Sequence, residues 1–294
     1  MTKPSISLIV TNWNGYRLLK KNLETVIQRS PEVSEFIVTD DASTDRSLNY
    51  LSALKSRYPN LVVTKHKHNL GFGKNSNNAV KRAKGDYIVL LNNDIQPQPG
   101  YLKPAIKLLA NPKTAAVGFS EVGNENWARI FWSGGYLQHA PGTPTLKPHP
   151  TAWVSGGGSI IKKDIFLKSG GFDSAYAPFY YEDADLGLRL WLAGYQLLWC
   201  PTSRIIHRHE STMSQFPPHF LNYVKERNRL LLTWRIINSP RLLSKNRLAI
   251  WLRVLGGPNY LKIIRAARLQ MTAHPQPVFI RTLSSESLLA VLGS

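Results

Sequence analysis

The chain has 294 residues, of which 43% are hydrophobic, which is enough for one large α/β domain with an appendage. A single cysteine, Cys200, excludes an internal disulfide and indicates a reducing compartment. Residues 1–7 lack the layout of a signal peptide, and no apolar run reaches the roughly 20 residues that span a bilayer, so we expect a cytoplasmic protein.

The net charge of +19 is unevenly distributed. Residues 204–294 hold 14 basic and 3 acidic side chains, although they make up less than a third of the chain. Such a tail can bind nucleic acid, anionic lipid or a phosphorylated substrate, and charge alone does not choose among these partners.

Strand-like and helix-like segments alternate through the first half. We predict strands at 5–12, 35–40, 60–66 and 87–93, and helices at 16–29, 43–58 and 73–84. This order predicts a parallel sheet with helices on both faces. Ligands of such sheets bind beyond the carboxyl ends of the strands. Polar segments follow all four predicted strands, at 11–14, 40–45, 69–73 and 92–94.

The second half is less regular. We predict strands at 115–122, 153–163 and 195–201, a helix at 183–194, and a long excursion rich in Gly, Pro and aromatic residues at 123–150. Basic helices are expected at 220–237, 244–255 and 257–271. The pattern predicts an α/β fold followed by a helical, basic C-terminal region.

The acids after the second predicted strand allow two interpretations. In "DDASTD" (40–45), Ser43 or Thr44 can cap the next helix, and Asp45 can complement its dipole. Capping does not explain the two acids before them, so a ligand contact stays open.

Asp94 ends "YIVLLNND" and also has two interpretations. A turn rich in Asn and Asp after a strand is ordinary. One carboxylate at an open strand end also suits a divalent cation that shares its coordination with substrate phosphates.

Three acids open the helix predicted from "YYEDADLGLRL" (180–190), namely Glu182, Asp183 and Asp185. Acids favour helix N-termini, but a carboxylate at the edge of a cavity can also act as a general base. His207 and His209 follow the last predicted strand. They are either surface residues or metal ligands, if Asp94 lies near them.

Taken together and in this order, the motifs resemble those of the family 2 glycosyltransferases, with the nucleotide-sugar-binding GT-A (Rossmann-like) fold. The matching segments are "SLIVTNWNG", "FIVTDDASTD", "NLGFGKNSNNA", "GDYIVLLNND", "GGGSIIKKDIFLKSGGFD", "YEDADLGLRLWLAGY" and "CPTSRIIHRHEST", which cover about residues 5–212. The pattern is most similar to the rhamnosyltransferase-like branch that builds bacterial surface polysaccharides. The resemblance implies a catalytic domain at 1–212, with a nucleotide-binding half (1–114) and an acceptor-binding half (115–212), and a basic helical region at 213–294.

The resemblance also implies roles for individual residues. The positions that match nucleotide-binding residues are Thr11, Asn14, Asp41, Asn69, Gly71, Asn77 and Asn93. Asp94 matches the end of the metal motif, His207 matches a histidine that can bind the metal or the diphosphate, and Asp183 matches the general base. Gly157, Gly158 and the "GGFD" at 170–173 match the acceptor-side wall.

The implied enzyme is an inverting hexosyltransferase that uses a nucleoside-diphosphate sugar and a divalent metal, Mn²⁺ or Mg²⁺. The implied acceptor is a hydroxyl of a glycan or of a lipid-linked sugar in the cell envelope. One departure from the family pattern is Asn92, which replaces the usual first acid of the metal motif. We therefore expect free protein to bind metal weakly and more tightly with donor.

The resemblance also bears on the basic tail, where basic and apolar residues alternate through 220–271. We expect these helices to lie on an anionic membrane, at the inner face of the plasma membrane. A helical cap with a solvated basic face and a homodimer contact remain alternatives.

Two other functions remain open. A nucleotidyltransferase that makes nucleotide-sugars shares the α/β layout, but it usually carries a glycine-rich basic loop where this chain has "TNWNGYRLL". A nucleic-acid-binding protein would explain the charge, but it would not explain "YEDAD", and the chain has no aromatic-basic RNA motif. We therefore expect no nucleic-acid partner.

Overall fold

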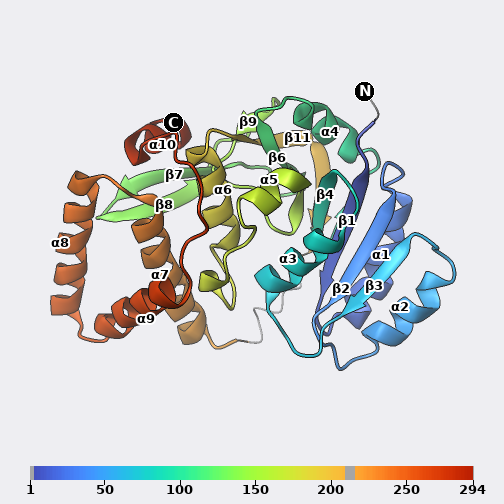
Figure 1. The fold of residues 1–294 in the computed structure, drawn as a ribbon, viewed down its shortest axis with the longest axis horizontal. Helices are drawn as coiled ribbons and strands as arrows, with labels where there is room; N and C mark the ends of the chain where they lie inside the picture. The colour runs from blue at the N-terminus through green and yellow to red at the C-terminus, as the bar shows by residue number, and fades with distance from the viewer. Residues whose placement is uncertain (1–2, 209–215, 294) are drawn as a thin grey trace.

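The first four strands form a parallel sheet, as predicted from the sequence. They are β1 (Ile6–Asn12), β2 (Glu35–Asp40), β3 (Leu61–Lys65) and β4 (Tyr87–Asn92), and they lie in the order β3-β2-β1-β4. The helices between them are α1 (Tyr16–Gln28), α2 (Ser47–Lys55) and α3 (Phe72–Arg82). The structure is a computed structural model that describes residues 3–208 and 216–293 (Figure 1).

Successive side chains of the central strands face opposite sides of the sheet, and each side has its own buried core. Leu8 and Val10 of β1 lie in a core that also contains apolar residues of α1, α2 and α4 (Leu102–Leu109). Ile9, between them, belongs to the other core, which includes residues of α3, α5 (Lys163–Lys168) and α6 (Glu182–Leu192). Because side chains alternate along a strand, burial on both faces explains why these strands are almost entirely apolar.

The second half of the sheet is mixed rather than parallel. β4 pairs antiparallel with β10 (Gly158–Lys162), which pairs antiparallel with β6 (Thr114–Glu121). β11 (Gln196–His207) runs parallel to β6 and antiparallel to β5 (Ile95–Pro97), and the short β9 (His149–Pro150) also pairs with β11. β10 begins only at the third of the three glycines that were expected inside a strand.

The segment expected as an excursion contains a β-hairpin, formed by β7 (Ala128–Ser133) and β8 (Tyr136–Pro141). Along β7 only Ile130 is fully buried, so burial does not alternate regularly along the strand. Without that alternation, the sequence carries little of the usual signal for a strand.

Within residues 216–293 the C-terminal region has four helices: α7 (Pro218–Ile236), α8 (Pro240–Gly256), α9 (Tyr260–Ala273) and α10 (Ser285–Leu292). The first three were predicted, and α10 was not. In Figure 1 these helices gather at one end of the molecule, around the β7–β8 hairpin, and β1, β2 and β3 lie at the other end.

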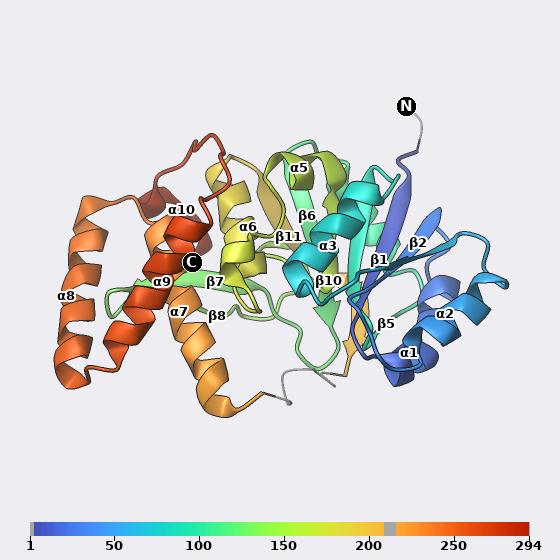
Figure 2. The same ribbon diagram turned by 60° about the horizontal axis from the view of Figure 1, so that its bottom comes forward.

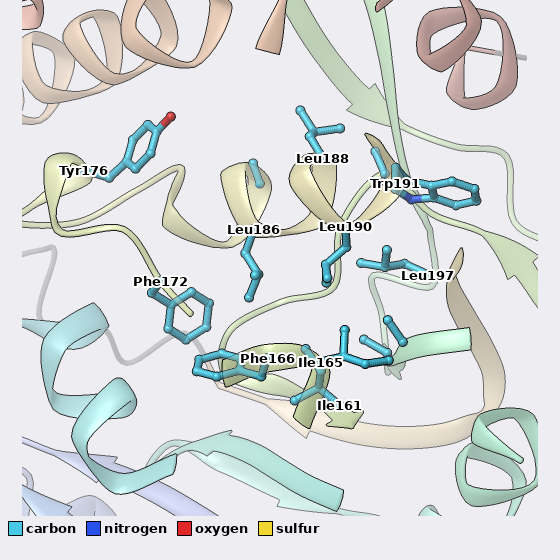
Figure 3. Close-up of a cluster of buried hydrophobic side chains, with 14 of the residues drawn as sticks. Ile161, Ile165, Phe166, Phe172, Tyr176, Leu186, Leu188, Leu190, Trp191 and Leu197 are labelled. Atoms are coloured by element: carbon cyan, nitrogen blue, oxygen red, sulfur yellow. The ribbon is translucent and has the colours of Figure 1, made fainter. Parts of the chain in front are cut away.

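The C-terminal helices share a hydrophobic core with α6. This core contains Leu231 and Ile236 of α7, Leu288 of α10, and Leu188 and Trp191 of α6. Figure 3 shows Leu188 on one side of α6, and Leu186 and Leu190 on the other side, toward Phe166 and Ile161. Helix α6 is therefore buried on two sides, between the sheet and the C-terminal helices.

None of the helices in 3–208 and 216–293 is long and apolar enough to cross a membrane. The domain boundary at residue 212 stays a prediction.

Candidate active site

The carboxyl ends of β1, β2 and β4 are joined by side-chain hydrogen bonds. Asn12 donates through Nδ2 to Oδ2 of Asp40 (2.8 Å) and accepts through Oδ1 from Nδ2 of Asn93 (2.9 Å). A β-carbon at Gly15 would lie 2.2 Å from Nδ2 of Asn93, so only glycine fits there without a shift. The polar ends of three strands thus form one compact edge, as expected for a parallel sheet.

The predicted cap of α2 is wrong for Ser43 and Thr44. The helix begins at Ser47, and its N-cap makes no side-chain hydrogen bond. Ser43 instead donates through Oγ to Asp40 (2.7 Å) and accepts from the backbone N–H of Asn14 (2.8 Å). The cap interpretation fails because the Ser43 hydroxyl binds the backbone of Asn14, in the loop after the neighbouring strand β1. The sequence around Ser43 cannot reveal that contact.

Asp45 does complement helix N-termini, and it serves two of them. It accepts from the backbone N–H of Ser47 at the start of α2 and from that of Tyr16 at the start of α1, both at 2.9 Å. Asn14 has a left-handed φ of 49° and accepts from the N–H of Thr44 at 2.8 Å. These contacts fix the turn after β1 against the turn after β2.

Asp41 organises the loop that precedes α3. Its carboxylate accepts from the backbone N–H of Leu70 (2.8 Å) and of Gly71 (2.9 Å), and Asn69 also accepts from Gly71 (2.9 Å). Burial raises the pKa of Asp41, and the hydrogen bonds from Leu70 and Gly71 act in the opposite direction. Thr11 lies at the same edge, in register with Thr39 and Asn92.

Both polar atoms of the Asn77 side-chain amide bind the backbone of Phe172. Its Nδ2 donates to the carbonyl of Phe172 (2.8 Å), and its Oδ1 accepts from the N–H of the same residue (3.0 Å). This pair of bonds holds the "GGFD" segment against α3. The predicted nucleotide contact of Asn77 remains a prediction, and these contacts support a positioning role.

Asp94 and His207 lie together, as required for a shared site. Nε2 of His207 lies 3.1 Å from Oδ1 of Asp94, and Nδ1 lies 3.4 Å from Oε2 of Glu121. Burial lowers the pKa of His207, but the hydrogen bonds and charges of the two carboxylates outweigh it and raise the pKa to about 9. The imidazole is therefore protonated at neutral pH and bridges the turn after β4 to the end of β6.

Glu121 was missed from the sequence. It is the last residue of β6, so the signal that singled out Asp94, an acid at the end of an apolar strand, was present there too. His209, the second candidate histidine, lies outside the described residues.

The side chains present can accommodate a divalent cation, although they form no ready-made cage. Asp94 has an exposed fraction of 5%, and its Oδ1 accepts no hydrogen bond from the described residues other than the contact with His207. No group of three or more His, Cys, Asp or Glu side chains in the described part of the chain has the geometry of a metal site. One carboxylate and one imidazole fit a cation whose other ligands come from a bound molecule.

Asp183 lies in the first turn of α6, and two residues with left-handed backbone precede that helix in the chain. Tyr180 and Tyr181 have φ values of 71° and 76°, which is uncommon for bulky residues. Asp183 accepts from the backbone N–H of Ala184 at 2.8 Å. Burial raises its pKa, and the N–H groups of Ala184 and Gly156 oppose the rise.

Asp183 also lines a narrow cavity of about 10 Å³ between α6 and the sheet. Among the other lining residues are Gly156, Ser159, Phe172 and Gly187. A carboxylate that borders a mostly apolar space has the environment that can tune it toward proton transfer.

The three acids of α6 have different surroundings. Burial, together with the charge of Asp183, raises the pKa of Glu182 to about 8. Asp185 is fully buried, pairs with Nε of Arg189 at 2.7 Å and accepts from the hydroxyl of Tyr176 at 3.0 Å. Asp185 thus belongs to the core, which leaves Glu182 and Asp183 as candidates for chemistry.

A short backbone link joins Asp183 to the end of β4. The N–H of Asn92 donates to the carbonyl of Gly157 at 3.0 Å, and a β-carbon on Gly157 would lie 2.3 Å from the Asn92 side chain. Gly156, next in the chain, is the residue whose N–H affects the Asp183 pKa. The glycines therefore bring the end of β4, two residues before Asp94, close to the helix that carries Asp183.

Helix α7 holds the turn that presents Asp183. Nδ2 of Asn228 donates to the carbonyls of Tyr176 (3.0 Å), Phe179 (3.0 Å) and Tyr180 (2.8 Å). Arg227 donates to the carbonyl of Ala177 and is 7% exposed, so it is not part of a solvated basic face. Sequence reasoning missed Asn228, because nothing in the α7 sequence distinguishes it from the exposed amide of Asn222 in the same helix.

Comparison with known proteins finds a matching family model and similar sequences. The family model described as glycosyl transferase family 2 matches residues 7–170. The N-acetylglucosaminyl-diphospho-decaprenol L-rhamnosyltransferase of Mycobacterium tuberculosis is 26% identical over 63% of this chain and 70% of its own length. Polypeptide N-acetylgalactosaminyltransferase 8 of Drosophila melanogaster is 27% identical over 69% of this chain and 38% of its own length. The chain spans only 25% of another relative, the uncharacterized protein y4gI of Sinorhizobium fredii.

Solved structures share the fold. The structure of GalNAc-T7 with UDP, GalNAc and Mn²⁺ has a TM-score of 0.62 at 18% identity, over 78% of this chain and 48% of that one. The mannosyltransferase PcManGT from Pyrobaculum calidifontis, with GDP-Man and Mn²⁺, has a TM-score of 0.59 at 19% identity, over 99% and 79%. The sheet is the GT-A fold expected from the sequence, and the rhamnosyltransferase match agrees with the branch expected there. The chain belongs to glycosyl transferase family 2.

Proposed function

We propose that the protein transfers a sugar from a nucleoside-diphosphate donor to a hydroxyl of a glycan or lipid-linked acceptor, with inversion at the anomeric carbon. The observation that carries the proposal is the Asp94–His207 pair, 3.1 Å apart, at the polar strand edge that the Asn92–Gly157 contact links to Asp183. The rhamnosyltransferase relative supports a place in bacterial surface polysaccharide synthesis. The proposed location is cytoplasmic, at the inner face of the plasma membrane.

A divalent cation, Mn²⁺ or Mg²⁺, would be held by Asp94 and, once deprotonated, by His207. When bound, it would stabilise the negative charge of the diphosphate leaving group. The Mn²⁺ in the structures of GalNAc-T7 and PcManGT supports this choice of cofactor. Because Asn92 supplies no second charge, the diphosphate itself would have to complete the coordination, and we propose that metal and donor bind together.

The nucleotide is proposed to lie along the edge formed by the ends of β1 and β2 and the loop before α3. The residues proposed to line it are Thr11, Asn14, Asp41, Asn69, Gly71, Asn77 and Asn93. Several act through the loop they shape: Asp41 and Asn69 fix Gly71, and Asn93 fixes Asn12. Such bonds set the shape of the site before the donor arrives, which lowers the ordering cost of binding.

Asp183 is proposed as the general base. The acceptor hydroxyl attacks the anomeric carbon, its proton passes to the Asp183 carboxylate, and the bond to the diphosphate oxygen breaks with its electron pair on the leaving group. A pKa raised by burial makes the carboxylate a stronger base, while the nearby Glu182, with a pKa of about 8, keeps its proton at neutral pH. A neutral Glu182 adds no negative charge beside Asp183.

A screen of nucleotide-sugars by thermal shift, with Mn²⁺, with Mg²⁺ and with chelator, tests the proposal. A donor that raises the melting temperature only with metal is the expected result. If no nucleotide-sugar or nucleoside diphosphate shifts the transition under any of these conditions, the proposed activity is wrong.

A further inference from the structure

Helix α8 carries an exposed apolar stripe. The side chains of Leu248, Trp251, Leu252 and Leu255 are between 55% and 64% exposed. Figures 1 and 2 both show α8 at the end of the molecule opposite α2. Large contiguous apolar patches are uncommon on soluble surfaces and usually mark a partner or a membrane.

The four residues lie on one face of the helix, because their spacing of three, one and three residues follows the helical repeat. The opposite face of α8 contacts the rest of the protein. Nδ2 of Asn246 donates to the carbonyl of Gly135 (2.7 Å), its Oδ1 accepts from the indole of Trp234 (2.9 Å), and Ile250 packs against the neighbouring buried cluster. The stripe is therefore exposed while the helix itself is anchored.

The charge around the stripe is basic. Lys245 and Arg241 lie about one and two helical turns before Leu248 on the same face, and Arg247 flanks it; all three are exposed. Helix α8 contains no acidic residue. A basic face would repel its copy in a symmetric dimer, whereas it is attracted by anionic lipid headgroups.

We propose that α8 is the membrane-docking element of this protein, with the stripe inserted into the headgroup region of an anionic bilayer. Trp251 and the three leucines would enter the interface, and the basic residues would remain at the level of the lipid phosphates. This inference deepens the proposed function, because a lipid-linked acceptor would be presented at the same surface. Binding of α8 to a membrane does not depend on catalysis, so the membrane-docking inference and the proposed function can fail separately.

The test is co-sedimentation of the full chain with vesicles of phosphatidylcholine alone and of phosphatidylcholine with phosphatidylglycerol, without donor or metal. A variant that combines Leu248→Gln, Trp251→Gln, Leu252→Gln and Leu255→Gln removes the stripe at side chains that are all more than half exposed. The matched control is Val278→Gln with Ile280→Gln, which also removes exposed apolar side chains (94% and 84%) but leaves α8 intact.

We expect wild type and control to bind anionic vesicles, and the α8 variant to lose binding by about tenfold or more. Binding should also weaken with added salt, since part of it is electrostatic.

Equal binding by the α8 variant, or binding independent of phosphatidylglycerol, would overturn the inference. A dimer that the α8 variant abolishes, with no vesicle binding by wild type, would overturn it in favour of a second copy. The thermal response to nucleotide-sugars should be the same in all three proteins, so failure here is separable from failure of the proposed function.

Discussion

The imidazole of His207 bridges Oδ1 of Asp94, at 3.1 Å, and Oε2 of Glu121, at 3.4 Å, and so ties the end of β11 to two other strand ends. Its pKa of about 9 in the folded protein is above its ordinary value of 6.5. Between these values the folded state holds a proton that the unfolded state has lost.

The stabilisation from this bridge should be fully present below about pH 6.5 and disappear as the pH rises through about 9. It amounts to at most about 3 kcal/mol in the free energy of unfolding. Urea unfolding at about pH 6.5 and at about pH 9 should show this loss of unfolding free energy in wild type. A His68→Gln control, whose imidazole is exposed in wild type, should show the same loss. If His207→Gln keeps the same pH dependence as wild type, the bridge does not contribute as described.

Asp94→Ala should remove most of the metal-dependent donor affinity. Asp94 is the one charged side chain of the proposed metal motif, because Asn92 is neutral. We expect titration calorimetry with Mn²⁺ to show at least about tenfold weaker donor binding than in wild type. Asp164→Ala, at an exposed carboxylate (63%), should behave like wild type. A wild type that binds donor equally well in chelator would contradict the metal role.

Asp185→Ala should destabilise the fold. The carboxylate pairs with the buried Arg189, whose Nη2 also donates to the carbonyl of Gly171 (2.8 Å). Removing one partner leaves a buried guanidinium without its counter-charge, which typically costs about 3–5 kcal/mol. Chemical unfolding of the variant measures this loss. A change below about 1 kcal/mol would show that Asp185 is not the structural acid of the three.

Asn228→Ala should lower kcat without raising KM for the donor. The amide holds the carbonyls of the turn that leads to Asp183, on the proposed acceptor side of the site and away from the proposed nucleotide edge. Unsatisfied carbonyls should also reduce stability by about 1–3 kcal/mol. Initial rates at varied donor concentration separate the two parameters. Asn222→Ala, on the exposed side of α7, is the matched control, and a rise in donor KM instead of a fall in kcat would argue against a positioning role.

The sheet and part of the site could be predicted because their signals are local. Apolar runs that end in polar residues marked β1, β2 and β4, and parallel pairing brings those ends to one edge. Asp94 and His207 were predicted to meet only on condition that their segments converge. β5, beside Asp94, pairs with β11, which ends at His207, so the pairing meets that condition.

The parts that could not be predicted depend on contacts between distant segments. Ser43 is a reasonable helix cap by its position, yet its hydroxyl binds Asp40 and the backbone at Asn14. The side chain of Asn228 binds the turn before α6, some 50 residues earlier in the chain, and nothing in the sequence of α7 indicates that contact. The basic tail was also ambiguous: Arg227 is buried and binds the carbonyl of Ala177 in the turn before α6, whereas the stripe of α8 is exposed.

Asp183→Asn provides the most direct test of sugar transfer with Asp183 as the base. The variant keeps the size of the side chain and removes only its ability to take a proton. Turnover with a donor found in the thermal-shift screen, measured alongside the donor dissociation constant, should fall by about 10²–10⁴-fold while donor affinity stays close to wild type. Turnover near the wild-type level in a variant that binds donor normally would contradict the assignment.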